Sequence, residues 1–307
     1  MSDLNQQDEK LVGVEVSASS FKAVSIGKDG TLLHSHRTLL NRETEVSPQL
    51  INFVNDLKVE FGEFNKIGIA VPGLLSRETK RVAVSTHVPQ QIGVDFAEEI
   101  RSKSGVEAIL ENDANAAAYA EFMLGAGRGC RDMFYATLGT GVGGALIFDG
   151  TIWRGTSGFA GEFGYIAIDE DGRRLEEVAS KRNIVRRTTT RFHQDTTSSL
   201  VMIDEDSIKI SDVVREAQDG DDFSRLMLER TGHYVGAAIA GVINLLNIER
   251  IVIGGEVMEA ENLVLDAITQ KAKEFSFAPS FATVQILKGH FGDTAASIGV
   301  ALLSAEA

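Results

Sequence analysis

The chain has 307 residues, a formal charge of -14 and a pI of about 4.9. This acidic balance argues against general binding to nucleic acid or to a membrane surface, and it suits a cytoplasmic enzyme. The single cysteine, Cys130, excludes a disulfide framework and a cysteine-rich zinc site. The first ten residues are polar and acidic, which is not the composition of a signal peptide.

The first third of the chain alternates strands and helices after an antiparallel start. Apolar runs and turn signals predict strands at 11–17, 21–26, 32–38, 66–71, 81–84 and 106–110. Helical spacing predicts helices at 48–61, 94–104 and 114–124. Gly105 is placed to end the second of these helices. Such an order is typical of a mixed α/β domain.

The second half repeats this order. A hairpin is expected at 133–138 and 145–148, followed by strands at 165–168, 250–253 and 283–287. Helical patterns cover 175–192 with a break, 211–218, 222–247, 262–275 and 294–304. Two halves built alike indicate a duplicated α/β architecture with a cleft between the halves. We place an N-terminal domain at 1–117, completed by the closing helix 294–307, and a C-terminal domain at 118–293.

A carboxylate lies at the junction between the strand 106–110 and the helix that follows. Asn112 and Asp113 fall at the cap or in the first turn, where such side chains satisfy free backbone amides. Helix capping is therefore one interpretation of Asp113. The helix N-terminus also keeps a carboxylate ionised, as a general base requires, so capping and catalysis are compatible.

A glycine-rich turn follows the strand 133–138. Gly139, Gly141 and Gly144 have the G-x-G-x-x-G spacing of dinucleotide-binding folds, but the next segment is predicted to be a strand. Without a helix N-terminus to receive a pyrophosphate, the dinucleotide interpretation fails. Glycine still lets backbone amides approach a phosphate closely, and an ordinary hairpin remains the alternative.

One basic segment stands out in this acidic chain. It contains five cations at helical spacing: Lys181, Arg182, Arg186, Arg187 and Arg191. We interpret it first as a solvated or subunit-facing helix, with a site for an anion or nucleic acid as the alternative.

Four motifs together resemble the ROK family, named for repressor, open reading frame and kinase, and most closely its bacterial glucokinase-like sugar kinases. They are Glu-Asn-Asp-Ala-Asn at 111–115, Leu-Gly-Thr-Gly-Val-Gly-Gly at 138–144, Ala-Gly-Glu-Phe-Gly at 160–164 and Ile-Gly-Gly at 253–255. The resemblance extends over 11–303. It implies the actin-like ATPase (ribonuclease H-like) duplicated α/β fold, with two domains and with ATP and sugar meeting in an interdomain cleft.

The resemblance also implies roles by position. Asp113 would be the base that takes the proton of the sugar hydroxyl, with ATP and Mg²⁺ as cofactors. The implied sugar ligands are Gly73, Asn112, Asp113, Glu162 and Glu176. The second phosphate loop would be Gly139, Thr140 and Gly141, and the adenosine contact Gly254 and Gly255.

The chain departs from the family pattern at two places. The first phosphate motif, Asp-x-Gly-Gly-Thr, is here Glu-Val-Ser-Ala-Ser, so Glu15, Ser17 and Ser19 keep polar groups while both glycines are lost. In the zinc segment Tyr165 replaces the histidine and the cysteines are absent, so we expect no structural zinc and no other metal ligands. Either Tyr165 is expected to reach into the sugar pocket, or Phe163 and Tyr165 are expected to pack where the zinc lobe would brace the helix of Glu176. A sugar-loop asparagine is also not apparent at 86–88.

We therefore predict ATP-dependent phosphorylation of a hexose or related sugar. The alternative is a sugar-binding pseudokinase of the same family without efficient ATP turnover. A repressor would need a helix-turn-helix before Leu11, and only about ten residues stand there. The expected partner is a small-molecule sugar, with no nucleic acid and no membrane, and a homo-oligomer is expected, most simply a dimer.

Overall fold

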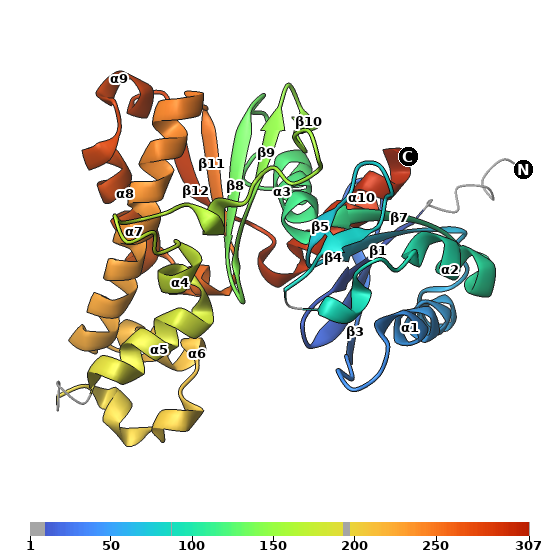
Figure 1. Cartoon of the computed structure of the whole chain (residues 1–307), viewed down its shortest axis with the longest axis horizontal. Helices are drawn as coiled ribbons and strands as arrows, with labels where there is room; N and C mark the ends of the chain where they lie inside the picture. The colour runs from blue at the N-terminus through green and yellow to red at the C-terminus, as the bar shows by residue number, and fades with distance from the viewer. Residues whose placement is uncertain (1–9, 87, 193–196, 307) are drawn as a thin grey trace, which may run out of the picture. The chain divides into compact units, whose positions relative to one another are not determined.

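The computed structural model describes residues 10–86, 88–192 and 197–306, and the chain divides into two compact units (Figure 1). The first comprises 1–128, 151–160 and 293–307, and the second 129–150 and 161–292. The boundary expected at 117 falls inside a continuous helix, and the chain leaves the first unit after Arg128. The closing helix belongs to the first unit.

The first unit is built on a five-stranded sheet in the order β3-β2-β1-β4-β7. The strands are β1 (Leu11–Val16), β2 (Ser20–Ile26), β3 (Leu32–Leu39), β4 (Lys66–Val71) and β7 (Glu107–Asn112). The first three are antiparallel, whereas β1, β4 and β7 run parallel. The parallel strands all end at one edge of the sheet, which brings the end of β7 beside the end of β4.

Helices complete the first unit. They are α1 (Val46–Phe61), α2 (Phe96–Ser104), α3 (Asp113–Leu124) and α10 (Ala295–Glu306), with the short strands β5 (Leu74–Leu75), β6 (Val82–Val84) and β10 (Thr151–Ile152) and the turn η1 (Pro89–Gln91). The side chains of alternate β1 residues, Val12, Val14 and Val16, pack with buried residues of α1 in one hydrophobic core. On the other face, a Cβ at Gly13 would lie 2.0 Å from the carbonyl oxygen of Ser297, so α10 packs directly on the sheet backbone.

In the second unit the strands run in the order β9-β8-β11-β12. They are β8 (Met133–Leu138), β9 (Val142–Phe148), β11 (Arg250–Gly254) and β12 (Gln285–Lys288). β8 and β9 form an antiparallel hairpin, and β11 lies parallel to both β8 and β12. The predicted glycine hairpin is therefore confirmed, although β9 begins at Val142 and includes two of the glycines.

The helices of the second unit are α4 (Glu176–Ala179), α5 (Lys181–Phe192), α6 (Ile210–Gln218), α7 (Asp222–Leu246), α8 (Asn262–Phe275) and α9 (Ala278–Phe281). Short 3-10 turns lie at η2 (Phe163–Tyr165), η3 (Ser199–Met202), η4 (Glu205–Ser207) and η5 (Glu256–Ala260), and η6 (Gly292–Thr294) leads into α10. The predicted break in 175–192 is present at Ser180. Within the described residues, no helix is both long enough and apolar enough to cross a membrane.

One expected element is wrong. Residues 165–168 do not form a strand, because the chain instead makes the η2 turn and then a single bridge between Ala167 and Arg174. The bridge closes a tight reversal at Asp169–Gly172, where the Gly172 amide donates to the Asp169 carbonyl oxygen. A reversal this short leaves no room for a ladder of several residues.

Packing of α3 on α10 gives a testable constraint. A Cβ at Gly299 would lie 1.7 Å from the carbonyl oxygen of Ala116, so Gly299→Ala must push the two helices apart. We expect the free energy of unfolding to fall by about 1–3 kcal/mol or more in urea titrations. Gly241→Ala is the control, because nothing lies within 4 Å of its Cβ position. It should stabilise the chain by about 0.5–1 kcal/mol, and equal effects from both variants would contradict the described packing.

Candidate functional site

The strand-to-helix junction orients Asn112 and Asp113. Asn112 is the N-cap of α3, and its Oδ1 accepts the backbone N–H groups of Ala114 at 2.9 Å and Asn115 at 3.1 Å. Asp113 is the first helical residue rather than the cap, and its Oδ1 accepts from Ala114 N–H at 2.9 Å and Asn112 Nδ2 at 3.1 Å. The capping interpretation thus applies to Asn112, and Asp113 is held in a fixed orientation at the positive end of α3.

An ion pair between the buried Glu111 and the partly exposed Arg154 supports this junction, and neither residue has a role implied by the motifs. Glu111 is 5% exposed and accepts from Arg154 through Nε at 2.9 Å and through Nη2. Its other oxygen accepts from Asn112 N–H and from Asn115 Nδ2, both at 2.9 Å. The sequence did offer a signal for this contact: Glu111 is a charged residue at the end of an otherwise apolar strand, and it lies four positions before Asn115.

The loop after β4 reaches the same junction. The Gly73 carbonyl oxygen accepts from Asn112 Nδ2 at 2.9 Å. Gly73 has φ +151°, and a Cβ there would lie 2.4 Å from the Val84 carbonyl oxygen, so no other residue fits this close approach. The structure therefore brings together three of the expected sugar-binding residues, Gly73, Asn112 and Asp113. Residue 87, in the loop where the asparagine was not apparent, lies outside the described residues.

The turn between β1 and β2, where the first phosphate motif was expected, is closed by its own side chain. Ser17 Oγ accepts the backbone N–H groups of Ser19 at 3.4 Å and Ser20 at 3.0 Å, and donates to the Ser20 carbonyl oxygen at 2.8 Å. Arg42 Nε donates to the Ala18 carbonyl oxygen at 2.6 Å. No residue of the turn has positive φ, so it has no need of the missing glycines.

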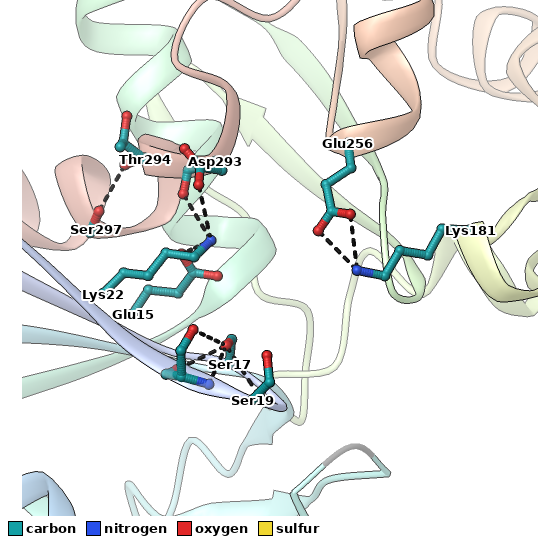
Figure 2. A network of polar contacts seen from close by, with 10 residues as sticks. Glu15, Ser17, Ser19, Lys22, Lys181, Glu256, Asp293, Thr294 and Ser297 are labelled. Carbon is teal, nitrogen blue, oxygen red and sulfur yellow. Dashed lines mark hydrogen bonds and ion pairs between the residues drawn. The ribbon is translucent and has the colours of Figure 1, made fainter. Parts of the chain in front are cut away.

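Beside this turn, Lys22 lies between two carboxylates (Figure 2). Its Nζ is 3.5 Å from Glu15 Oε2 and 3.6 Å from Asp293 Oδ2, and it donates to the Asp293 carbonyl oxygen at 3.3 Å. Burial raises the pKa of Glu15 above its ordinary value, and the Lys22 ammonium partly offsets that rise. The Glu15 carboxylate, which the first phosphate motif would turn toward a nucleotide, is thus already paired with the Lys22 ammonium.

The turn between β8 and β9 differs from the first turn. Gly139 N–H donates to the Gly141 carbonyl oxygen at 3.0 Å, which closes the turn on itself. Within residues 10–86, 88–192 and 197–306, the N–H groups of Thr140 and Gly141 have no protein acceptor. Backbone donors left open at a glycine turn suit a phosphate oxygen.

Glu162 and Glu176 lie near each other in the second unit. Partial burial, and then the Glu176 carboxylate, raise the pKa of Glu162. Glu176 begins α4, and its Oε2 accepts the N–H of Val142 at 2.9 Å. Glu176 is therefore tied to the residue that follows the second phosphate turn, a contact that the motif did not indicate.

Tyr165 does not enter the core. It is 51% exposed, and the Arg174 guanidinium lies 4.2 Å from its ring centroid. Phe163 is the buried aromatic residue, in edge contact with Phe134 at 5.0 Å between ring centroids. Both roles expected for Tyr165, a sugar contact and packing with Phe163 where the zinc lobe would brace the helix of Glu176, remain predictions.

Two glycines shape the loop after β11. A Cβ at Gly254 would lie 2.3 Å from the Tyr135 hydroxyl, and one at Gly255 would lie 2.4 Å from the Leu138 carbonyl oxygen. Gly255 also has φ +92°, which disfavours any side chain. This loop, expected to contact adenosine, therefore packs directly on the backbone at the start of the second phosphate turn.

The basic segment is not a uniformly solvated helix. Arg182 and Arg186 are exposed, but Arg187 is partly buried and donates to Thr231 Oγ1 at 2.6 Å. Burial, together with nearby arginines, lowers the pKa of Arg187 to about 10. Lys181 pairs with Glu256 instead of joining the other cations.

The residues present fit parts of a nucleotide site. The second turn offers open amides, whereas the first turn has bonded its amides to Ser17. In the described part of the chain, no group of three or more His, Cys, Asp or Glu side chains could hold a metal ion. The expectation of no structural zinc remains a prediction.

The ROK family model matches residues 11–307, so the chain belongs to the ROK family. Glucokinase of Thermotoga maritima is 28% identical, over 97% of this chain and 98% of that protein. The xylose repressor of Bacillus spizizenii is 24% identical, over 98% of this chain and 78% of the repressor. A ROK family glucokinase from Streptomyces griseus, solved in complex with glucose and AMPPNP, matches with a TM-score of 0.88 at 24% identity, over 97% of this chain and 100% of that one.

These likenesses confirm the α/β fold class. The chain has the actin-like ATPase fold with two domains. Kinases and a repressor are similar to nearly the whole chain, so the fold alone does not choose between phosphorylation and regulation. The choice depends on the residues of the site.

The pKa of Glu162 gives a testable pH dependence. Because its pKa is raised above 4.5 in the folded chain, the folded state holds this proton more tightly than the unfolded state. The stability contributed by this carboxyl group is therefore lost as pH rises from about 4.5 through the raised pKa. We expect Glu162→Gln to melt at a higher temperature than the parent at pH 7.5, with a smaller difference at pH 4. Glu177→Gln, an exposed carboxylate on α4, is the control, and an equal gain at both pH values for Glu162→Gln would refute the argument.

Proposed function

We propose that this member of the ROK family transfers the γ-phosphoryl group of ATP to a hydroxyl of a hexose or related sugar. Asp113 is the general base in this proposal. Asn112, the backbone of Gly73, Glu162 and Glu176 bind sugar hydroxyls. The sequence relatives called glucokinases support sugar phosphorylation in general, and which sugar is used follows from neither the family nor the fold.

The observation that carries the proposal is the fixed orientation of Asp113. Its carboxylate is held by Asn112 Nδ2 and the Ala114 amide, and Asn112 is held in turn by Gly73 and by the buried Glu111. A base works only when it is placed within hydrogen-bond reach of the proton it takes. A side chain that served packing alone would not need this chain of polar contacts.

The chemistry follows from these positions. ATP, when bound, supplies the phosphoryl group, and Mg²⁺ neutralises charge on its phosphates. Asp113 takes the proton of the attacking hydroxyl, the hydroxyl oxygen bonds to the γ-phosphorus, and the bond to the ADP oxygen breaks. The open amides of Thr140 and Gly141 bind phosphate oxygens, and Gly254 and Gly255 contact adenosine in this proposal. The site needs few other groups, because a loose transition state mainly requires positioning and charge stabilisation.

A second candidate is a sugar-binding pseudokinase, and two observations favour it. Ser17 Oγ accepts the amides of Ser19 and Ser20, which would otherwise face a phosphate, and Lys22 already pairs with Glu15. A chain of this kind would keep sugar binding and lose efficient ATP turnover. The absence of a nucleic-acid partner remains a prediction, since repressors are among the relatives.

Asp113→Asn separates the two candidates. The Asn112 cap is untouched and an amide oxygen can still accept from Ala114, so unfolding should change by only about 0.3–1 kcal/mol. Loss of the base should lower kcat by about 10²–10⁴-fold in a coupled ADP assay across a hexose panel, while sugar binding by calorimetry persists.

Asp222→Asn is the matched control for this variant. Asp222 is also the first residue of a helix that follows a capping side chain, that of Asp221. Asp222→Asn should lower the free energy of unfolding by about as much as Asp113→Asn does, and it should leave kcat unchanged. If the parent chain binds a sugar but phosphorylates none with any nucleoside triphosphate, the kinase proposal is wrong and the pseudokinase stands.

A second variant tests the first turn. Ser17→Gly with Ala18→Gly removes the hydroxyl that occupies the Ser19 and Ser20 amides, so we expect ATP affinity to rise about threefold or more by calorimetry. Ser17→Thr keeps a hydroxyl and should bring no gain. Weaker ATP binding by the glycine variant would instead show that the serine hydroxyls themselves serve the nucleotide.

A further inference from the structure

Lys181 and Glu256 connect two loops that lie far apart in sequence, and the proposed function assigns neither residue a role. Lys181 Nζ donates to both carboxylate oxygens of Glu256, each at 2.9 Å (Figure 2). Lys181 is the first residue of α5, and Glu256 opens η5 directly after Gly255. The two side chains are 32% and 43% exposed.

The backbone of Lys181 reaches the second phosphate turn. Its N–H donates to the Gly139 carbonyl oxygen at 2.8 Å. One residue therefore bonds the β8–β9 turn through its main chain and the loop after β11 through its side chain. The Gly255 backbone also lies on Leu138 so closely that a Cβ there would be 2.4 Å from the Leu138 carbonyl oxygen.

We propose that the Lys181–Glu256 pair is a brace that holds the loop Gly254–Glu256 against the turn Gly139–Gly141. The inference rests on the proposed function insofar as these two segments contact the adenosine and the phosphates of one nucleotide. Such a brace fixes the spacing between the two contacts before the nucleotide arrives. Pre-organisation of this kind raises affinity by reducing the ordering cost of binding.

The brace predicts a selective effect on nucleotide binding. Lys181→Met and Glu256→Gln should each raise the KM for ATP by about twofold to fivefold, the range that a partly exposed ion pair can supply. The KM for the sugar and kcat should stay near their parent values, because neither residue contacts the sugar or the reacting atoms in this proposal. Equilibrium binding of a non-hydrolysable ATP analogue should weaken by the same factor.

Two rescues distinguish a brace from direct phosphate binding by Lys181. Lys181→Arg keeps a cation that can bond both carboxylate oxygens, and the exchange Lys181→Glu with Glu256→Lys restores the pair with reversed charges. Both should recover ATP affinity. If Lys181→Met loses far more affinity than Glu256→Gln and the exchange does not recover it, Lys181 contacts phosphate directly and the brace is wrong.

Hydrogen exchange tests the brace without any nucleotide. In Lys181→Met the hydrogen-bonded amides of the two segments, Gly139 N–H to the Gly141 carbonyl oxygen and Met258 N–H to the Gly255 carbonyl oxygen, should exchange faster, and in Lys181→Arg they should return to the parent rate. Lys271→Met, which removes the Lys271–Glu274 pair on α8, is the control and should leave both segments unchanged. If these amides exchange at the parent rate in Lys181→Met, the brace is wrong. If the parent chain binds no nucleotide, the proposed function is wrong, and hydrogen exchange alone then tests whether the brace exists.

Discussion

The candidate site depends on one buried carboxylate, that of Glu111. A charge taken out of water must be paired and hydrogen-bonded, and Glu111 meets this need with donors from Arg154, Asn112 and Asn115. Asn115 can reach Glu111 only if the strand ends and α3 begins without an intervening loop. The pairing therefore stabilises the abrupt junction at which Asn112 caps the helix and Asp113 follows. Loss of Arg154 would leave the carboxylate buried and unpaired, so the site and the stability of the first unit are linked through the same group.

The two turns expected to bind phosphate differ in whether their backbone amides are already hydrogen-bonded within the chain. At the first, the Ser17 hydroxyl accepts the backbone amides of Ser19 and Ser20, and Lys22 lies between Glu15 and Asp293. At the second, glycines leave the amides of Thr140 and Gly141 open. The contrast is chemical rather than topological, since both turns join antiparallel strands.

Membership of the ROK family places the chain among relatives that include glucokinases and repressors of the same fold. A fold shared by both groups supports sugar recognition more readily than a particular reaction. The residues proposed to decide whether the chain phosphorylates a sugar are few: Asp113 as the proposed base, the side chain of Ser17, and the Lys181–Glu256 pair.

The sequence by itself determined the elements whose signals are local. The helices at 48–61 and 262–275 and the glycine hairpin after β8 follow from periodicity and from turn residues, and the structure confirms them. Asn112 and Asp113 were placed at the helix start for the same reason. These features depend on neighbours within a few residues, so the order of amino acids is enough to reveal them.

Only the tertiary structure decided which polar groups meet. Lys22 contacts Asp293 across 271 positions, Lys181 contacts Glu256 across 75, and Arg154 contacts Glu111 across 43. Such pairs leave no periodic trace, because their geometry depends on how sheets and helices pack. The strand expected at 165–168 was wrong for a related reason, since a reversal closed by one bridge overrides local strand preference. Whether a side chain such as Ser17 accepts hydrogen bonds from the backbone amides of its turn also depends on the direction of that side chain, and the sequence motif does not predict that direction.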